Sequence, residues 1–388
     1  MRGLTVPFVS ALLFLSFFLS ANAFSEEPLK IIAGPYLMDF DQTRMTVMWE
    51  TNLPAPSTVL YGEEAPLTSE IARPEPATIH EVVLEGLKPE TSYYYQILST
   101  DSAGKEVTAE VATFMTAVHP DTAFAYCVMG DHRTYPDRYE KIADLAYAER
   151  PNFVINVGDV VSNGTVKQQW IDEFLFPARK LMARVPTYIS IGNHEKNADW
   201  YYKYVSYPKP ENYYSFDFGN SHFTIVDSNQ PLVPGQEQYK WIEQDLAQSN
   251  ATWKFVVHHH PPYSSDENDY GDTVKKFEKT DRGEVDMREV TKLYDKYDVD
   301  LVWVGHIHDY ERTWPLTDGK VDQENGVIYI QTGGGGAELE NFAPTRSWFT
   351  AKVFRGWQFC SVAIHGKTLR MMAYDIDGKM YDYLDLAK

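Results

Sequence analysis

The chain has 388 residues, of which 44% are hydrophobic and 23% charged, and its formal net charge is -20. This composition supports hydrophobic cores in two domains and excludes a disordered chain. The negative charge argues against general binding of nucleic acids or anionic membranes, which need basic patches, and an anionic ligand would be repelled unless bound metal ions reversed the local field.

Residues 1–23 are predicted to be a secretory signal. Arg2 supplies the positive start, Leu12 to Leu19 the apolar run, and Ala21-Asn22-Ala23 a small-x-small cleavage site. The alternative is a membrane anchor, but the apolar stretch is short and is interrupted by proline and serine. No later stretch is long and apolar enough to span a bilayer, so we expect a soluble mature protein that is secreted or periplasmic.

The only two cysteines, Cys127 and Cys360, both lie in apolar, strand-like runs. Export would permit a disulfide between them, but a distance cannot be read from sequence. We expect two separately buried thiols.

Residues 30–117 are predicted to form a small all-β domain. Apolar and polar residues alternate over residues 45–50 and again over 57–61, with turn residues between the runs. The pattern Leu87-x-Pro-x-Thr-x-Tyr93, with Trp49 upstream, resembles a fibronectin type III domain. Tyr93 is then the corner tyrosine whose hydroxyl ties a strand end to the backbone, and Trp49 is a core residue.

Residues 122–388 alternate short apolar runs with helix-like stretches, which predicts an α/β domain with mainly parallel strands. The expected strands are Phe124–Met129, Phe153–Val157, Tyr188–Ile191, Phe223–Val226, Phe255–Val257, Leu301–Val304 and Val327–Thr332. The expected helices are Tyr139–Arg150, Lys167–Arg184, Gln236–Gln248 and Val285–Tyr297. The last stretch, Gln358 to Leu386, returns to strand alternation with a hairpin signal at Asp377-Gly378.

Five short blocks of metal-ligand residue types each follow a strand-like run. They are Gly130-Asp131, Gly158-Asp159, Gly192-Asn193-His194-Glu195, His258-His259-His260 and Gly305-His306-Ile307-His308. In open α/β sheets, ligands gather beyond the carboxyl ends of the strands. Glycine before a ligand lets the backbone turn tightly and come close to an ion. The order of the blocks predicts one dinuclear metal centre.

These blocks resemble the calcineurin-like metallophosphoesterase superfamily. The string Gly305-His306-Ile307-His308-Asp309-Tyr310-Glu311-Arg312-Thr313 is similar to purple acid phosphatases, as is the Val-x-x-His-x-Pro-x-Tyr pattern of residues 256–263. A fibronectin-like domain ahead of the catalytic domain also fits that branch. The resemblance runs from about residue 30 to the end and implies a four-layer α/β/β/α sandwich for the second domain.

The resemblance also implies the metal ligands. Asp131 and His308 hold one ion, Asn193, His259 and His306 hold the other, and Asp159 bridges both. The cofactor is then a pair of divalent or mixed-valence ions, with Fe, Zn or Mn expected from the oxygen and imidazole ligands. A metal-activated water is the nucleophile, and the substrate is a small phosphate ester.

Two further residues take catalytic or supporting roles by the same resemblance. His194 lies beside the phosphate and donates to the developing oxyanion or the leaving oxygen. Glu195 is its expected orienting partner.

The chain departs from the family at the remaining ligand of the first metal. The superfamily has His two residues after the first Asp or, in purple acid phosphatases, Tyr three residues after the bridging Asp; here these are Arg133 and Ser162. We expect either an open position or a contribution from His132, and the backbone turn that aims Asp131 favours the first. Without a tyrosinate, no purple Fe(III) colour is expected. Arg133 either clamps phosphate oxygens or pairs with a carboxylate such as Glu195.

Three more features adjoin the site. By strand alternation His258 and His260 face away from His259, although His260 reaches the site as a substrate contact if the strand ends there. Gly333 to Gly336 is expected to be a close-approach loop, because it lacks the Lys-Ser or Lys-Thr of a nucleotide-binding loop. The acidic stretch Ser264 to Arg282 is expected to be an exposed loop near the site, where purple acid phosphatases often have histidines.

The leading hypothesis is an exported, dinuclear-metal-dependent phosphatase acting on phosphate monoesters. A phosphodiesterase or nucleotide hydrolase on the same site is the alternative within this chemistry. A surface or binding protein that keeps the metal fold without activity is the alternative from another class.

Overall fold

The computed structural model describes residue 3, residues 27–266 and residues 283–388. The predicted signal lies outside these residues except for Gly3, as does most of the stretch from Ser264 to Arg282. Within the described ranges, no helix is both long and apolar enough to cross a bilayer.

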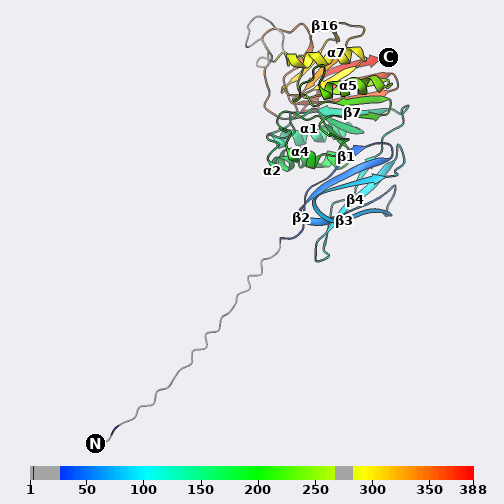
Figure 1. Ribbon diagram of the computed structural model, residues 1–388, viewed down its shortest axis with the longest axis vertical. Helices are drawn as coiled ribbons and strands as arrows, with labels where there is room; N and C mark the ends of the chain where they lie inside the picture. Colours follow the sequence, from blue (N-terminus) through cyan, green and yellow to red (C-terminus); the bar gives the residue numbers. More distant parts are fainter. Residues whose placement is uncertain (1–2, 4–26, 267–282) are drawn as a thin grey trace.

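The N-terminal domain is an antiparallel β-structure, blue to cyan in Figure 1. Its strands are β1 (Ile31–Phe40), β2 (Arg44–Gly62), β3 (Ser69–Glu85), β4 (Ser92–Thr100), β5 (Glu106–Thr108) and β6 (Ala112–Met115). The two runs predicted as separate strands form the single long strand β2, which pairs with β1, β3 and β4. The register with β3 shifts between Glu50 and Ser57, so the segment with Pro54 and Pro56 passes through an irregularity in the pairing rather than ending the strand.

Both aromatic predictions for this domain are confirmed. The backbone N–H of Lys88 donates to the Tyr93 hydroxyl over 3.0 Å, as in a tyrosine corner. Trp49 is fully buried, stacks on His80, and donates its indole N–H to Ser99 Oγ over 3.1 Å. Trp49 is therefore part of the domain core.

The second domain holds two sheets between layers of helices. The first has the order β21-β20-β19-β7-β8-β9 and the second the order β10-β11-β12-β13-β17-β14-β18. Helices α1 (Pro136–Ala148) and α4 (Asp199–Tyr204) lie on one side, and α5 (Glu237–Gln248) and α7 (Arg288–Lys296) lie on the other (Figure 1). This is the predicted α/β/β/α sandwich.

The strands of the first sheet are β7 (Phe124–Met129), β8 (Phe153–Asn156), β9 (Thr187–Ile189), β19 (Gln358–His365), β20 (Thr368–Asp375) and β21 (Met380–Ala387). Those of the second are β10 (Tyr214–Phe218), β11 (Ser221–Ile225), β12 (Trp253–Val257), β13 (Leu301–Val304), β14 (Tyr310–Thr313), β17 (Ile328–Thr332) and β18 (Thr350–Phe354). A small hairpin of β15 (Leu316–Thr317) and β16 (Lys320–Val321) lies apart from both sheets.

The central strands are parallel, as predicted, because they are buried between layers and read as continuous apolar runs. Tyr126 of β7 shows this burial: its ring contacts those of Phe223, Phe255 and Trp303 across the sheets, at centroid distances of 5.3, 5.7 and 6.4 Å. Antiparallel strands form both edges of the second sheet and the β21 edge of the first, which includes the predicted hairpin at Gly378, whose φ is 75°. The other edge of the first sheet is β9, which is parallel to β8.

The predicted helix Lys167–Arg184 is instead three short pieces. They are α2 (Lys167–Gln169), a π-helical turn (Trp170–Leu175) and α3 (Arg179–Met182). Pro177 breaks the run, because proline lacks the backbone N–H and clashes with the preceding turn. The helix predicted from Val285 likewise opens with a 3₁₀ turn (Val285–Met287) before α7.

Cys127 and Cys360 are buried free thiols on the neighbouring strands β7 and β19. The prediction of two separately buried thiols is confirmed.

Side-chain contacts fix the N-terminal domain against the α/β domain. The buried carboxylate of Glu50 accepts a hydrogen bond from the Tyr204 hydroxyl over 2.7 Å and also contacts Lys167. The Tyr95 hydroxyl donates to the Ala183 carbonyl over 2.8 Å. The two domains therefore share a buried interface with paired polar groups.

A charged cluster at the β10–β11 hairpin makes stability depend on pH. Burial alone would lower the pKa of His222, but hydrogen bonds to Asp217 at 2.7 Å and Asp245 at 3.0 Å outweigh it and raise the pKa to about 9. The folded-state pKa exceeds the ordinary value of 6.5, so this stabilisation is complete below pH 6.5 and is lost as pH rises through about 9. We expect the free energy of unfolding to fall by about 3 kcal/mol over that range. Urea unfolding at several pH values measures it; an equal decline in His222→Gln would contradict this assignment.

Candidate metal centre

The five predicted blocks meet where the carboxyl ends of strands from both sheets face each other. The blocks of Asp131, Asp159 and Asn193 follow β7, β8 and β9, while those of His259 and His306 follow β12 and β13. Three of these residues have a positive φ: 55° at Asp131, 54° at Asp159 and 71° at His306. Such strained conformations concentrate at functional sites, so these φ values support a functional site in these loops.

The glycines in the blocks allow the carboxylates to approach the neighbouring backbone. A Cβ on Gly192 would lie 2.4 Å from Asp159 Oδ1, and one on Gly305 would lie 2.4 Å from Asp131 Oδ2. Any larger residue would displace a carboxylate, so glycine is required here by the close approach of backbone and carboxylate.

One group of donor atoms surrounds the Asn193 side chain. Asn193 Oδ1 lies 3.0 Å from His259 Nε2 and 3.1 Å from His306 Nδ1. His259 Nδ1 is 2.8 Å from the Val157 carbonyl, so it donates there and Nε2 is left to face the site. His259 Nε2 is also 3.4 Å from Asp159 Oδ1, which joins this group to the next.

A second group consists of Asp131, Asp159 and His308, whose ligand atoms lie within 4.8 Å of one another. His308 Nε2 is 3.7 Å from Asp131 Oδ1, and its Nδ1 is 2.7 Å from the Glu338 carbonyl, which orients the ring. Both carboxylates are buried. The structure therefore brings together all six residues predicted as metal ligands.

The electrostatics of these groups fit cations. Burial raises the pKa of Asp131 well above its ordinary value. Burial would also raise the pKa of Asp159, but contact with His259 lowers it overall. Although burial opposes it, the same two carboxylates raise the pKa of His259 to about 10. The carboxylates thus attract positive charge, and their oxygens with imidazole nitrogens are donors that suit Fe, Zn or Mn.

Arg133 lies beside the second group. Its Nε is 3.4 Å from Asp159 Oδ2 and its Nη2 is 3.3 Å from His308 Nε2, and the side chain is 20% exposed. Its carboxylate partner is therefore Asp159 rather than Glu195, the pairing considered from the sequence. The guanidinium stands at the solvent side of two expected ligands.

Glu195 holds two loops together and does not orient His194. The buried Glu195 carboxylate accepts backbone N–H groups from Gly192 at 2.6 Å, Val160 at 2.8 Å and Asp159 at 3.0 Å. The partner of the His194 ring is the Ser162 carbonyl, 2.7 Å from Nδ1. His194 Nε2 faces the site, 3.9 Å from Asp159 Oδ2. The expected Glu195–His194 pairing is therefore wrong. The Glu195 carboxylate instead accepts three backbone N–H groups of the two loops.

Two residues considered as the remaining ligand of the first metal, Ser162 and His132, point away from the donor groups. The Ser162 hydroxyl donates to Glu173 over 2.9 Å, and Glu173 also accepts the Ser162 backbone N–H over 2.6 Å. His132 stacks on Tyr139 at 3.5 Å between ring centroids and its Nε2 contacts Asn156 over 2.7 Å. The prediction that His132 is aimed away from the site is confirmed.

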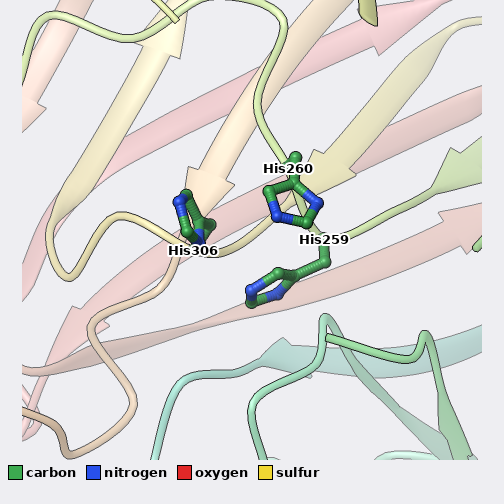
Figure 2. A group of neighbouring side chains, drawn as sticks. All are labelled: His259, His260 and His306. Carbon is green, nitrogen blue, oxygen red and sulfur yellow. The ribbon is translucent and has the colours of Figure 1, made fainter. Parts of the chain in front are cut away.

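The three consecutive histidines after β12 point in different directions. His258 is buried against Tyr294, away from the site. Since β12 ends at Val257, the backbone no longer alternates at His260, whose ring lies 4.6 Å from that of His306 (Figure 2). His260 thus reaches the site, as the sequence allowed.

Two loops were predicted to lie near the site, the glycine run 333–336 and the acidic stretch from Ser264, and only the first has the predicted character. A Cβ on Gly335 would lie 2.1 Å from the Gly130 carbonyl, so the glycine loop does approach the site closely. Ser264, Ser265 and Asp266 are buried, not exposed as predicted, because the Ser265 N–H donates to Glu311 over 2.7 Å. The rest of the predicted loop lies outside the described residues.

Sequence reasoning missed three supporting residues. Glu173 holds Ser162, Ser228 Oγ lies 2.8 Å from His260 Nδ1, and Asn229 donates to the Ile191 and Gly192 carbonyls at 3.2 and 3.3 Å. Ser228 and Asn229 follow β11 as the ligands follow their own strands, and this position was the available signal. Nothing in the sequence distinguishes Glu173.

Two family models match adjoining parts of the chain. The one described as Calcineurin-like phosphoesterase matches residues 119–310, and the one described as Purple acid Phosphatase, N-terminal domain, matches residues 36–116. A likeness to Probable inactive purple acid phosphatase 27 of Arabidopsis thaliana reaches 25% identity over 358 residues, which cover 80% of this chain and 56% of that protein. Phosphoenolpyruvate phosphatase of Allium cepa is 25% identical over 389 residues, covering 85% and 74%.

Solved structures agree on the fold. Purple acid phosphatase PPD1 from yellow lupin (Lupinus luteus) seeds matches with a TM-score of 0.80 and 21% identity, over 91% of this chain and 74% of that one. The chain spans little more than half the length of the Arabidopsis relative. On the two adjoining family matches and this fold, the chain belongs to the calcineurin-like metallophosphoesterase superfamily, in the branch with a purple acid phosphatase N-terminal domain.

Proposed function

We propose that this protein is a secreted or periplasmic phosphatase that uses two metal ions to hydrolyse phosphate monoesters. The observation that carries the proposal is the position of Asp159 between the two donor groups: Oδ1 lies 3.4 Å from His259 Nε2, and the same side chain is grouped with Asp131 and His308. A carboxylate shared by two clusters is suited to bridge two cations.

The residues divide into two ligand sets. Asp131 and His308 would hold the first ion, Asn193, His259 and His306 would hold the second, and Asp159 would serve both. Bound there, the ions supply a water of lowered pKa and neutralise phosphate charge. The positive charge of the two ions would offset the repulsion between an anionic substrate and a chain of net charge -20.

Two side chains face the substrate position. His194, held through Nδ1 by the Ser162 carbonyl, presents Nε2 to a phosphate oxygen or the leaving oxygen. Arg133 presents a guanidinium fork, which matches two phosphate oxygens. Glu195 keeps the loops of Asp159 and Asn193 in place and so acts through them.

The proposed organisation is a signal over residues 1–23, a fibronectin type III-like domain over 30–117 and the metallophosphoesterase domain over 122–388. The family models, over 36–116 and 119–310, support the division.

A substrate panel tests the activity. Aryl and alkyl monoesters, diesters and nucleotides are assayed on metal-depleted protein supplied with Mn, Zn or Fe. We expect metal-dependent turnover with the monoesters as the best substrates. Faster turnover of diesters would replace the substrate class with the diesterase alternative, and absence of turnover with every metal would reject the proposal.

A non-catalytic binding protein is the second candidate. It is favoured by the absence of the family's His or Tyr at Arg133 and Ser162, and by the printed name of the Arabidopsis relative, which calls that protein probably inactive. The presence of all six expected ligands in one place favours catalysis, and the same panel separates the two candidates.

The protein is also expected to lack the purple colour of an Fe(III)–tyrosinate centre. Ser162 stands at the position of the family's tyrosine, and its hydroxyl donates a hydrogen bond to Glu173. A serine hydroxyl cannot form the tyrosinate that gives the colour. A visible absorption spectrum of the iron-loaded protein measures this, with the protein loaded with zinc as the colourless control. An intense tyrosinate band would contradict the assignment.

A further inference from the structure

His260 stands at a position that the Val-x-x-His-x-Pro pattern leaves variable, between His259 and Pro261. Its ring is close to two expected ligands of the second ion. The centroids of His259 and His260 are 5.0 Å apart with the ring planes at 83°, and those of His260 and His306 are 4.6 Å apart. One ring nitrogen from each of the three lies within 4.8 Å of the others. Figure 2 shows the three side chains as neighbours.

The other side of the His260 ring is already held. Ser228 Oγ lies 2.8 Å from Nδ1 and also accepts the His260 backbone N–H over 3.0 Å. This leaves Nε2 as the atom available to the site. A ring nitrogen fixed by a hydrogen bond while the other faces the site is the usual arrangement of a metal-binding histidine.

We propose that His260 is a third imidazole ligand of the second metal ion, beside His259 and His306. The inference rests on the proposed function, since it assigns a ligand within the same centre. The second position then offers three imidazoles with Asn193 and Asp159, whereas the first offers the carboxylates of Asp131 and Asp159 with His308.

The consequence is an unequal pair of sites. Imidazole-rich sites suit Zn, Fe and Co, while carboxylate-rich sites suit Mn and Mg. Arg133 contacts Asp159 Oδ2 at 3.4 Å and His308 Nε2 at 3.3 Å, so its charge opposes a cation at the first position more strongly than at the second. The second position therefore fills first and holds its ion more tightly.

Cobalt titration tests the ligand. The full mature chain is stripped with a chelator and titrated with Co²⁺ while the visible d–d bands are followed, in wild type, His260→Gln and His260→Ala. We expect the first equivalent to bind at least about 10-fold more weakly in both variants, with altered d–d bands, and the second equivalent to be unchanged. Ser228→Ala keeps the imidazole but removes the hydrogen bond that orients it. The first equivalent of Co²⁺ should therefore bind more weakly than in wild type, by a smaller factor than in the His260 variants.

His258→Gln is the matched control, because it changes an adjacent buried histidine on the opposite side. It should leave both equivalents as in wild type, and thermal unfolding of the metal-free forms confirms that each variant is folded. Wild-type cobalt affinity and spectrum in folded His260 variants, with a raised KM, would overturn the inference and make His260 a substrate contact. If wild type itself bound no Co²⁺, the proposed function would fail with it.

Discussion

Replacing Asp159 by alanine should remove both metal binding and hydrolysis. Its carboxylate belongs to both donor groups: Oδ1 lies 3.4 Å from His259 Nε2, and the side chain is grouped with Asp131 and His308. Losing the bridge removes the metal-activated water, a contribution of several kcal/mol, so kcat/KM should fall by at least about 10³-fold. Metal content per chain and turnover of an aryl phosphate measure the two effects.

The neutral, nearly isosteric Asp159→Asn separates charge from shape. It can keep the contact to the His194 backbone N–H, 2.9 Å from Oδ1, and should still lose the metals. Asp245→Asn is the matched control, since Asp245 is a largely buried carboxylate in the His222 cluster, outside the centre. Full metal content and activity in Asp159→Ala would reject the bridging role.

Arg133→Met should move metal affinity and substrate affinity in opposite directions. The guanidinium contacts two expected ligands of the first ion, Asp159 and His308, at 3.4 and 3.3 Å. Its removal relieves repulsion of a cation there, so the first ion should bind more tightly. Phosphate loses charge-assisted hydrogen bonds, which contribute about 1.5–3 kcal/mol, so kcat/KM should fall by about 10–100-fold.

Metal titration and steady-state kinetics on the same preparation test this opposition. Arg138→Met is the control, because Arg138 donates to the Gly336 carbonyl and stacks on Tyr135 and Trp357, away from the carboxylates. Weaker metal binding in Arg133→Met, or an unchanged kcat/KM, would show that Arg133 has a structural role at Asp159.

The contrast between Glu195 and His194 shows where sequence reasoning stopped. Both belong to one block, and the family resemblance suggested that Glu195 orients His194. In the fold, Glu195 instead satisfies the backbone N–H groups of Gly192, Asp159 and Val160, because buried donors without partners are costly. The His194 ring instead hydrogen-bonds through Nδ1 to the Ser162 carbonyl, in the loop after β8. Which acceptor meets which donor depends on how two loops pack.

The sequence alone determined the two-domain fold class, the places of the main strands along the chain and the predicted ligand set. The domain types and the candidate site follow from local patterns: apolar runs of strand length, glycines before ligand residues, and five ligand blocks at strand ends. The ligand roles and the four-layer sandwich follow from the resemblance to purple acid phosphatases that these blocks carry. Only the tertiary structure decided that Arg133 faces Asp159 and His308, that Ser162 is bonded to Glu173, and that His260 lies beside His259 and His306. The reason is that these contacts join loops from different strands and sheets, so their distances are set by the packing of the two sheets and not by any spacing along the chain.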